Sequence, residues 1–249
     1  MFSVFSVLPF FHAGFFPMHD DTQVARVYEM GKALSDGVFP VRWVKDLGYG
    51  YGYPIFNFYS PLPYYIGGAL TLLGLDALLA TKITFVIGIL VSAVAMYFLA
   101  ERFFGKKIGV LAGLLYLYFP YHAVNIYVRG ALGELFAYAF LPLVFLGLFK
   151  IHYAKINGHP FKSVISSVLL SSMSIAFVIL SHNLSAFMLF LFIAAFIVAS
   201  IISSQEKLQR LIVYFTVLVF AFLFSAFYSV PASLESNFTN VNSQVGGGA

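Results

Sequence analysis

The chain has 249 residues, of which 61% are hydrophobic and only 10% are charged. Soluble domains carry roughly 25% charged residues, so this composition excludes a soluble globular protein and indicates an integral membrane protein. The formal net charge is +4. Most of the basic residues lie between apolar runs, where they act as topology signals and not as a nucleic-acid footprint. The absence of cysteine excludes disulfides and thiolate metal sites.

The apolar runs are uniformly rich in Phe, Leu, Ile and Val, which favours transmembrane helices over the alternating strands of a β-barrel. Each run is close to the roughly 20 residues that a helix needs to cross about 30 Å of hydrocarbon. We therefore expect an all-α, polytopic bundle of about seven spans, forming a single transmembrane module. The expected spans are residues 1–16, 83–100, 108–121, 135–149, 164–180, 184–202 and 211–230.

The two ends of the chain predict a fragment of a longer protein. Residues 1–16 are slightly short for a span, no Lys or Arg precedes them, and no signal-peptide cleavage site is visible. We interpret them as a clipped first helix. The end, residues 241–249, stops without a closing element.

Three connections carry most of the positive charge, and their alternation places them on one side of the membrane. They hold eight of the 14 basic residues, and only Glu101 and Glu206 oppose them. The positive-inside rule makes this side cytoplasmic, so we expect a cell-membrane protein whose long loop, residues 17–81, is extracytoplasmic. The three connections are residues 101–107, 150–162 and 205–210.

The run Leu62–Leu75 leaves a second topology open. Its 14 residues would cover only about 21 Å as a helix, so we expect it to lie at the membrane interface. If it crossed the membrane, residues 17–61 would be cytoplasmic instead. Residues 21–36 show apolar positions at helical spacing and predict a surface amphipathic helix, with Asp20 as a candidate N-cap and Gly37 as its stop.

The acidic pair Asp20-Asp21 follows the first apolar run. Two adjacent carboxylates can act as a general base, bind a divalent cation, or stabilise positive charge that develops on a sugar carbon. The alternative is that Asp20 only caps the following helix, and the two roles are compatible. His19 could ligate a metal or tune these carboxylates, or it could be an ordinary surface histidine.

The Gly-Tyr repeat of residues 48–53 interleaves flexible backbone with flat rings. Tyr51, Tyr53 and the nearby Tyr59 could therefore stack on sugar faces, whereas the competing interpretation is a simple aromatic belt at the membrane interface. Arg42 beside Trp43 adds a candidate phosphate contact next to an aromatic anchor.

Further polar residues are expected on the same side as the Asp pair. Arg129 and Glu134 lie at a membrane edge, where a charged side chain normally forms an ion pair or has a functional role. Arg129 is a candidate for binding a lipid-linked phosphate. The alternative is that Arg129 and Glu134 only form an ion pair with each other. His182 and Asn183 suggest a wall of the same cavity or a solvated turn. Glu235 belongs to the last outer segment.

These residues resemble the GT-C class of membrane glycosyltransferases, and more closely the membrane proteins labelled "6-pyruvoyl-tetrahydropterin synthase related". The resemblance extends over most of the chain, and the long loop is its most specific part. The matching pieces are His19-Asp20, residues 39–43, Gly48-Tyr49-Gly50, Pro54, residues 58–65, Arg129 with Glu134, Ser181-His182-Asn183, and Pro231 with Glu235.

The resemblance implies a sugar donor carried on a polyprenyl phosphate, transfer to an acceptor outside the cytoplasm, and a carboxylate such as Asp20 or Asp21 at the reacting centre. A divalent cation at these two residues is left open. The span centres carry no Asp, Glu, Lys or Arg, which counts against an ion-coupled transporter. The alternative to an enzyme is a non-catalytic membrane protein that binds or exports lipid-linked glycans.

Overall fold

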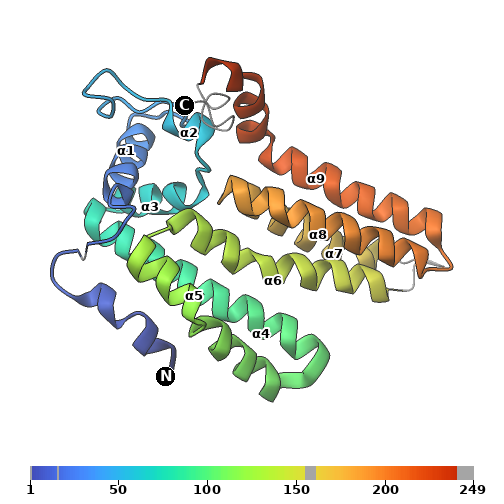
Figure 1. Cartoon of the computed structure of the whole chain (residues 1–249). Helices are drawn as coiled ribbons and strands as arrows, with labels where there is room; N and C mark the ends of the chain where they lie inside the picture. The colour runs from blue at the N-terminus through green and yellow to red at the C-terminus, as the bar shows by residue number, and fades with distance from the viewer. Residues whose placement is uncertain (1, 16, 155–160, 240–249) are drawn as a thin grey trace, which may run out of the picture.

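A computed structural model describes residues 2–15, 17–154 and 161–239 of the chain. Within these residues the fold is all-helical, and the only β feature is an isolated bridge between Val44 and Tyr53. Long helices run side by side over most of the molecule, and shorter helices gather at one end of them (Figure 1). The long helices are α4 (Ala77–Leu117), α6 (Leu132–Tyr153), α7 (Phe161–Ile179), α8 (Asn183–Ile202) and α9 (Lys207–Leu234).

Helix α4 is a helical hairpin, because the chain reverses at Gly105. This residue has a φ of +81°, a backbone conformation that side chains rarely adopt. After the turn, Gly109 and Gly113 pack against the first arm: a Cβ on Gly113 would lie 2.8 Å from the carbonyl oxygen of Ala93. Two of the expected spans, 83–100 and 108–121, therefore fall within one hairpin.

The returning arm does not continue as a single helix. It ends at Leu117, because Phe119 precedes a proline and is extended, with a ψ of 132°. Two short helices then carry the chain upward: α5 (Pro120–Ala123) and the π-helix η3 (Val124–Arg129). Gly130, with a left-handed φ of +65°, turns the chain into α6.

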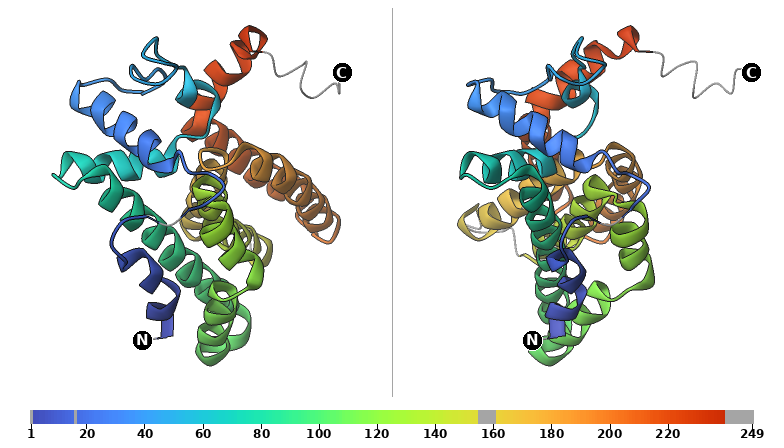
Figure 2. Two further views of the ribbon diagram at one scale, coloured as in Figure 1. Left: turned by 60° about the vertical axis from the view of Figure 1, so that its left-hand side comes forward. Right: turned by 90° about the vertical axis from the view of Figure 1, so that its left-hand side faces the viewer.

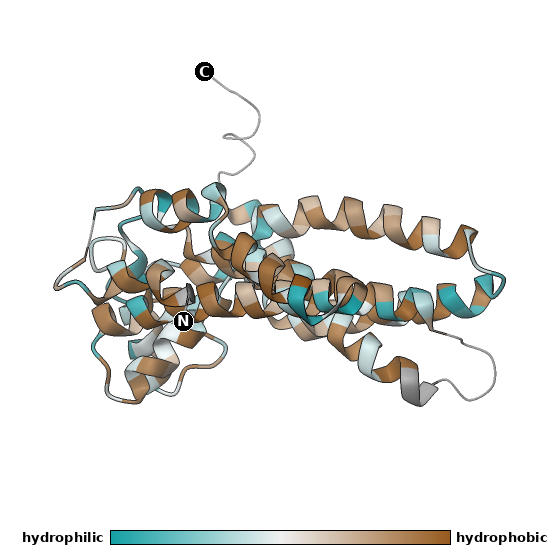
Figure 3. Cartoon of the chain, turned by 90° about the horizontal axis from the view of Figure 1, so that it is seen from below, coloured by the Kyte–Doolittle hydropathy of each residue, from teal (hydrophilic) through white to brown (hydrophobic). Residues whose placement is uncertain are grey.

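Among the described residues, four helices are long and apolar enough to cross a membrane: α4, α6, α8 and α9. A shorter apolar stretch, Val164–Ile179, belongs to α7. The expectation of a membrane-embedded helical bundle is confirmed, whereas the count of seven spans is not. Hydrophobic residues predominate along the long helices (Figure 3).

The expected first span is not an α-helix in the part of it that the structure describes. It contains two short 3-10 helices, η1 (Phe2–Ser6) and η2 (Leu8–Phe11), because Pro9 at the start of η2 interrupts regular backbone hydrogen bonding. The segment lies beside α4 in both views of Figure 2. Phe10 holds it there by stacking on Phe85, with 5.2 Å between ring centroids.

The long loop contains the amphipathic helix α1 (Gln23–Ser35), the short α2 (Ile55–Phe58) and α3 (Leu62–Leu72). Helix α3 has 11 residues and would cover only about 16 Å, so it is too short to cross, as its sequence predicted. The expected cap of α1 was wrong: Thr22 occupies the N-cap position and no side chain caps the helix. Gly37, with a φ of +77°, follows the end of the helix as expected.

Glycines set the close approach of α1 to α3. A Cβ on Gly67 would lie 2.7 Å from Val27, and one on Gly68 would lie 2.7 Å from Met30. Val27 and Met30 are fully buried by this contact. One hydrophobic core joins these two helices to α4 and the start of α6, and a second core lies among α6, α7, α8 and α9.

The two ends of the bundle differ in what they carry. The turn of α4 at Gly105, the end of α6 and the α8–α9 connection lie at one end (Figure 1), and these segments include the basic residues Arg102, Lys106, Lys107 and Lys150. The loop helices α1, α2 and α3 and the end of α9 lie at the other end. This arrangement gathers the long loop and the last outer segment in one place.

Candidate functional site

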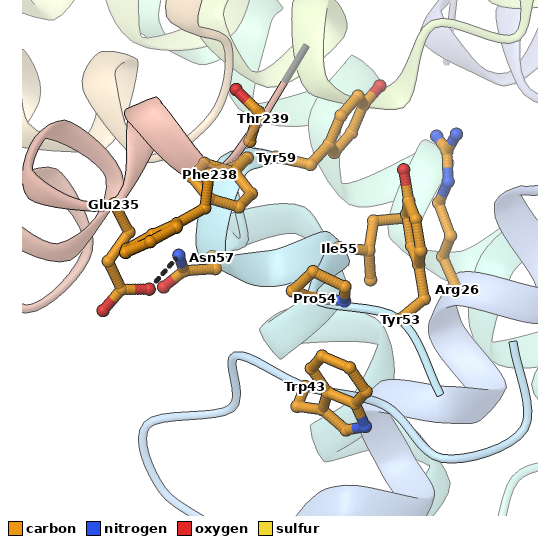
Figure 4. Close-up of a pocket in the computed structure, with 11 residues that line it drawn as sticks. Arg26, Trp43, Tyr53, Pro54, Ile55, Asn57, Tyr59, Glu235, Phe238 and Thr239 are labelled. Atoms are coloured by element: carbon orange, nitrogen blue, oxygen red, sulfur yellow. Dashed lines mark hydrogen bonds between the residues drawn. The ribbon is translucent and has the colours of Figure 1, made fainter. Parts of the chain in front are cut away.

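A cavity of about 650 Å³ lies between the long loop and the end of α9 (Figure 4). Its wall is aromatic and apolar over most of its extent, with a cation from α1 and a carboxylate from the end of α9. The residues that line it are Arg26, Trp43, Tyr53, Pro54, Ile55, Asn57, Phe58, Tyr59, Glu235, Phe238 and Thr239.

A tight turn in the loop brings Trp43 and Tyr53 to the cavity. Val44 and Tyr53 exchange both backbone hydrogen bonds, at 3.0 and 2.9 Å, and close the Gly-Tyr repeat into a turn. The indole of Trp43 lies directly on Gly52, where a Cβ would come within 2.2 Å of its Nε1 atom. Tyr51 is 89% exposed and does not line the cavity, whereas Tyr53 does.

Arg26 reaches the cavity from α1 and is held there by tyrosines. Its guanidinium lies 4.5 Å from the ring centroid of Tyr59, and its Nη1 donates to the Tyr64 hydroxyl at 3.3 Å. Burial acts to lower the pKa of Arg26, but Tyr64, Tyr59 and Asp20 outweigh it and raise the pKa, so the guanidinium stays charged. No carboxylate of the described residues lies within 4.0 Å of it.

A buried chain of hydrogen bonds ties this cation to the start of α6. The Tyr64 hydroxyl donates to Gln23 Oε1 at 2.7 Å, and Gln23 Nε2 donates to the carbonyl oxygen of Gly130 at 2.8 Å. Gln23 and Tyr64 are both fully buried. The position of Arg26 is therefore fixed by the tertiary packing of α1 against α3 and α6.

Glu235 supplies the carboxylate of the cavity. Asn57, which is only 4% exposed, donates its Nδ2 to Glu235 Oε2 at 2.8 Å. Figure 4 draws this bond on the side of the cavity away from Arg26. Asn57 joins α2 to the end of α9, residues that are far apart in the sequence.

Asn183 fastens the loop to the bundle and does not line the cavity. Its Nδ2 donates to the carbonyl oxygen of Phe58 at 3.0 Å, and its Oδ1 accepts from Ser60 at 2.8 Å and from Tyr228 at 2.9 Å. Both the Nδ2 and the Oδ1 of Asn183 are thus hydrogen-bonded within the protein. Asn183 was expected to bind substrate, but its contacts are those of a structural residue.

Arg129 and Glu134 form the ion pair that their spacing allowed, with 2.7 Å between Nη1 and Oε2. Nη1 of Arg129 also lies 3.2 Å from both the Tyr121 hydroxyl and Asn125 Oδ1, and Tyr121 donates a hydrogen bond to Glu134. The Arg129 side chain remains 45% exposed. Glu134 lies in the first turn of α6, where a carboxylate is favoured.

His182 lies beside this ion pair. It is the N-cap of α8, and its Nδ1 accepts from the backbone nitrogen of Ser185 at 3.3 Å. Burial lowers its pKa; the charges of Glu134 and Asp20 oppose this, whereas that of Arg129 reinforces it. The loop, η3 and α8 are thus brought within electrostatic reach of one another.

Asp20 is placed against η3 by its backbone. Its amide donates to the carbonyl oxygen of Arg129 at 2.8 Å, and that of His19 donates to Val128 at 3.0 Å. The His19 ring and the Asp20 carboxylate are 3.6 Å apart, with the carboxylate 35% exposed. Asp21 is exposed, and neither aspartate lines the cavity.

The possible metal site at Asp20 and Asp21 gains no third protein ligand. Within residues 2–15, 17–154 and 161–239, no group of three His, Asp or Glu side chains is close enough to hold an ion. The structure thus brings Tyr53, Tyr59 and Glu235 to the cavity, and Asp20, Arg129, Glu134 and His182 to a neighbouring cluster. Arg42 and Tyr51 belong to neither.

Arg26 and Asn57 are among the cavity residues that the sequence did not predict. Arg26 lies three residues after Gln23 and one before Val27, at the edge of the buried stripe of α1, so its helical position could have revealed it. Nothing local marks Asn57, because its partner lies in another segment of the chain.

The fold and this end of the bundle define an α-helical membrane protein with a polar, aromatic cavity outside its long helices. The family model described as "6-pyruvoyl-tetrahydropterin synthase related domain; membrane protein" matches residues 56–245, which is more than half of the chain. The chain therefore belongs to this family of membrane proteins, and it lies in a lipid bilayer. No curated protein and no solved structure matches it. The family part of the expected resemblance is confirmed.

Proposed function

We propose that the chain is a GT-C-like membrane glycosyltransferase module that takes a sugar from a polyprenyl-phosphate donor. Its bundle crosses the cell membrane about seven times, with the long loop outside, and the acceptor is glycosylated on that side. The observation that carries the proposal is the cavity itself, where Arg26, Glu235 and two exposed aromatic rings face one space.

The donor phosphate binds to Arg26. A guanidinium that is fixed by tyrosines and has no carboxylate partner among the described residues can form charge-assisted bonds to phosphate oxygens. Arg129 is the second candidate for this contact, since part of its guanidinium remains exposed beside the Glu134 pair. Arg26 lies in the loop helix α1 and Arg129 lies just before α6, so both can meet a headgroup whose tail stays in the bilayer.

The sugar stacks on the aromatic wall. Trp43 is 54% exposed and Tyr53 is 52% exposed, so about half of each residue is open to a ligand. Flat rings of this kind suit the apolar face of a pyranose. Glu235 then accepts hydrogen bonds from sugar hydroxyls.

The acceptor is deprotonated by a carboxylate of the loop. Asp20 fits this role better than Asp21, because its charge reaches both Arg26 and His182. Transfer with inversion would break the bond between the anomeric carbon and the donor phosphate oxygen, form a bond to the acceptor oxygen, and move the acceptor proton to Asp20. The polyprenyl phosphate leaves with the electrons of the broken bond.

A non-catalytic role is the second candidate, and one observation favours it. Asp20 and Asp21 do not line the cavity, so the cavity could bind a lipid-linked glycan without reacting with it. Donor binding would be the same in both cases, and only a glycosylated product separates them.

The test is transfer by the full-length protein in membranes with a radiolabelled polyprenyl-phosphate sugar. We expect the double variant Asp20→Asn/Asp21→Asn to lose transfer and to keep donor binding. Asp36→Asn is the matched control, because Asp36 pairs with Lys45 on the loop surface, 2.7 Å away. Unchanged turnover in the double variant would exclude the mechanism, and absence of product from the unmodified protein would favour the binding role.

A further inference from the structure

The cavity is electrically polarised along its length. Arg26 lies on one side, toward α1, and Glu235 lies on the other, at the end of α9, with Ile55, Pro54 and Tyr53 between them (Figure 4). No hydrogen bond or ion pair joins the two charged groups in the described part of the chain. A ligand that fills the cavity therefore meets a cation at one end and an anion at the other.

Glu235 is held toward this space by a buried amide. Asn57 donates to Oε2 and leaves Oε1 without a hydrogen bond from the described residues. The Oδ1 atom of Asn57 is buried and has no partner in the same part of the chain. A buried unsatisfied acceptor is costly, so Asn57 is not placed here for its own stability, and its hydrogen bond positions Glu235.

The charge at this end discriminates between classes of sugar. A carboxylate accepts hydrogen bonds from hydroxyl groups, but it repels a second carboxylate in a partly desolvated site. Phe58 and Phe238 also line the cavity. An acidic sugar would therefore meet a like charge where a neutral sugar finds an acceptor.

We infer that the cavity selects an uncharged, hydroxyl-bearing sugar and rejects a uronic acid, with the donor phosphate toward Arg26 and the sugar hydroxyls toward Glu235. This inference rests on the proposed function, since it names the class of sugar that the same cavity takes. It assigns the selection to Glu235 and its positioning to Asn57.

The experiment measures the binding of three short-chain lipids to the full-length protein in nanodiscs. The lipids are polyprenyl phosphate, its neutral hexose adduct and its hexuronate adduct. We expect the unmodified protein to bind the neutral adduct about tenfold tighter than bare polyprenyl phosphate, a gain of about 1.4 kcal/mol. The hexuronate adduct should bind no tighter than bare polyprenyl phosphate.

Glu235→Gln should gain affinity for the hexuronate adduct, which would not happen if Glu235 had only a structural role. Its amide oxygen can still accept from Asn57, so the join between α2 and α9 is kept, while the negative charge is removed. We expect this variant to bind the hexuronate adduct about tenfold tighter than the unmodified protein does. Glu101→Gln, which removes a negative charge near the Gly105 turn of α4, should leave all three affinities unchanged.

Asn57→Ala tests the positioning role. It frees Glu235, so the preference for the neutral adduct over the hexuronate adduct should narrow while binding of bare polyprenyl phosphate stays the same. Equal affinity of the unmodified protein for the two adducts, or no gain in Glu235→Gln, would overturn the inference. If bare polyprenyl phosphate still bound, the phosphate part of the proposed function would stand; if none of the three lipids bound, the proposed function would fail as well.

Discussion

Two arginines at opposite ends of the bundle differ in how far their hydrogen-bond donors are used. Arg210, near the start of α9, is 8% exposed and donates to the carbonyl oxygens of Ile151 at 2.8 Å and Ala154 at 3.1 Å. Its Nε also donates to Ser204 at 2.7 Å. Arg26 makes one hydrogen bond, to the Tyr64 hydroxyl, and lies at a cavity.

The comparison teaches that surroundings decide the role of a charged residue. Arg210 donates to carbonyl groups at the C-terminal end of α6, where helix carbonyls lack the usual i+4 donors, so its own donors are already used. The donors of Arg26 are largely unused in the described structure, although its position is fixed just as firmly. A fixed cation with unused donors suits an incoming anion.

The largest effect should come from Arg210→Gln. The change removes the charge-assisted hydrogen bonds from Arg210 to the carbonyl oxygens of Ile151 and Ala154, which we expect to lower the free energy of unfolding by about 3 kcal/mol. Thermal unfolding in detergent would measure it. Affinity for polyprenyl phosphate in the folded fraction should not change. A loss of this affinity without a loss of stability would contradict a purely structural role for Arg210.

Arg26→Gln should reduce affinity for polyprenyl phosphate and leave stability nearly unchanged, the opposite of Arg210→Gln. Loss of a charge-assisted hydrogen bond to phosphate is worth roughly 1.5–3 kcal/mol, so we expect affinity for polyprenyl phosphate to fall about 30-fold. The unfolding temperature should stay close to that of the unmodified protein. Arg26→Lys should recover part of the affinity, because the charge returns without the planar guanidinium. Equal affinity in all three proteins would remove Arg26 from the site.

A pair of glycines tests whether the aromatic wall of the cavity matters. Gly50 and Gly52 have nearly the same left-handed φ, +84° and +85°, so alanine costs similar backbone strain at both. Only at Gly52 would the new Cβ meet Trp43. We expect Gly52→Ala to weaken binding of the neutral sugar adduct about fivefold relative to Gly50→Ala, since the displaced ring would stack less well. Identical titrations for the two variants would argue against a role for Trp43.

The smallest effect concerns pH and His182. Burial lowers the pKa of His182, so the neutral ring contributes stability that is complete above its unfolded pKa of about 6.5 and is lost as the pH falls through and below that value. Protonation also removes the acceptor that caps α8. We expect the unfolding temperature to fall by a few degrees between pH 7.5 and 5.5, and to fall less in His182→Gln. A steeper fall in the variant would contradict the sign of this shift.

At the end of the bundle that carries the long loop, the sequence predicted local features better than it predicted contacts between distant segments. The length of α3 and the stop of α1 at Gly37 follow from residues close together in the chain, and both were found. Asp20 as a cap was wrong, because its backbone bonds to Arg129, more than a hundred residues away, and α1 begins after Thr22. The first apolar run also failed as a helix, since Pro9 and packing on α4 decided its conformation.

The sequence by itself determined that this protein lies in a membrane, because a chain with so many apolar and so few charged residues can satisfy its long hydrophobic runs only in lipid. It also determined the family to which the chain belongs. Only the tertiary structure decided that Arg26 faces a cavity opposite Glu235 and that Arg129 is paired with Glu134. The physical reason is that hydropathy is a property of each run, whereas the partner of a charged side chain depends on which distant segments fold together.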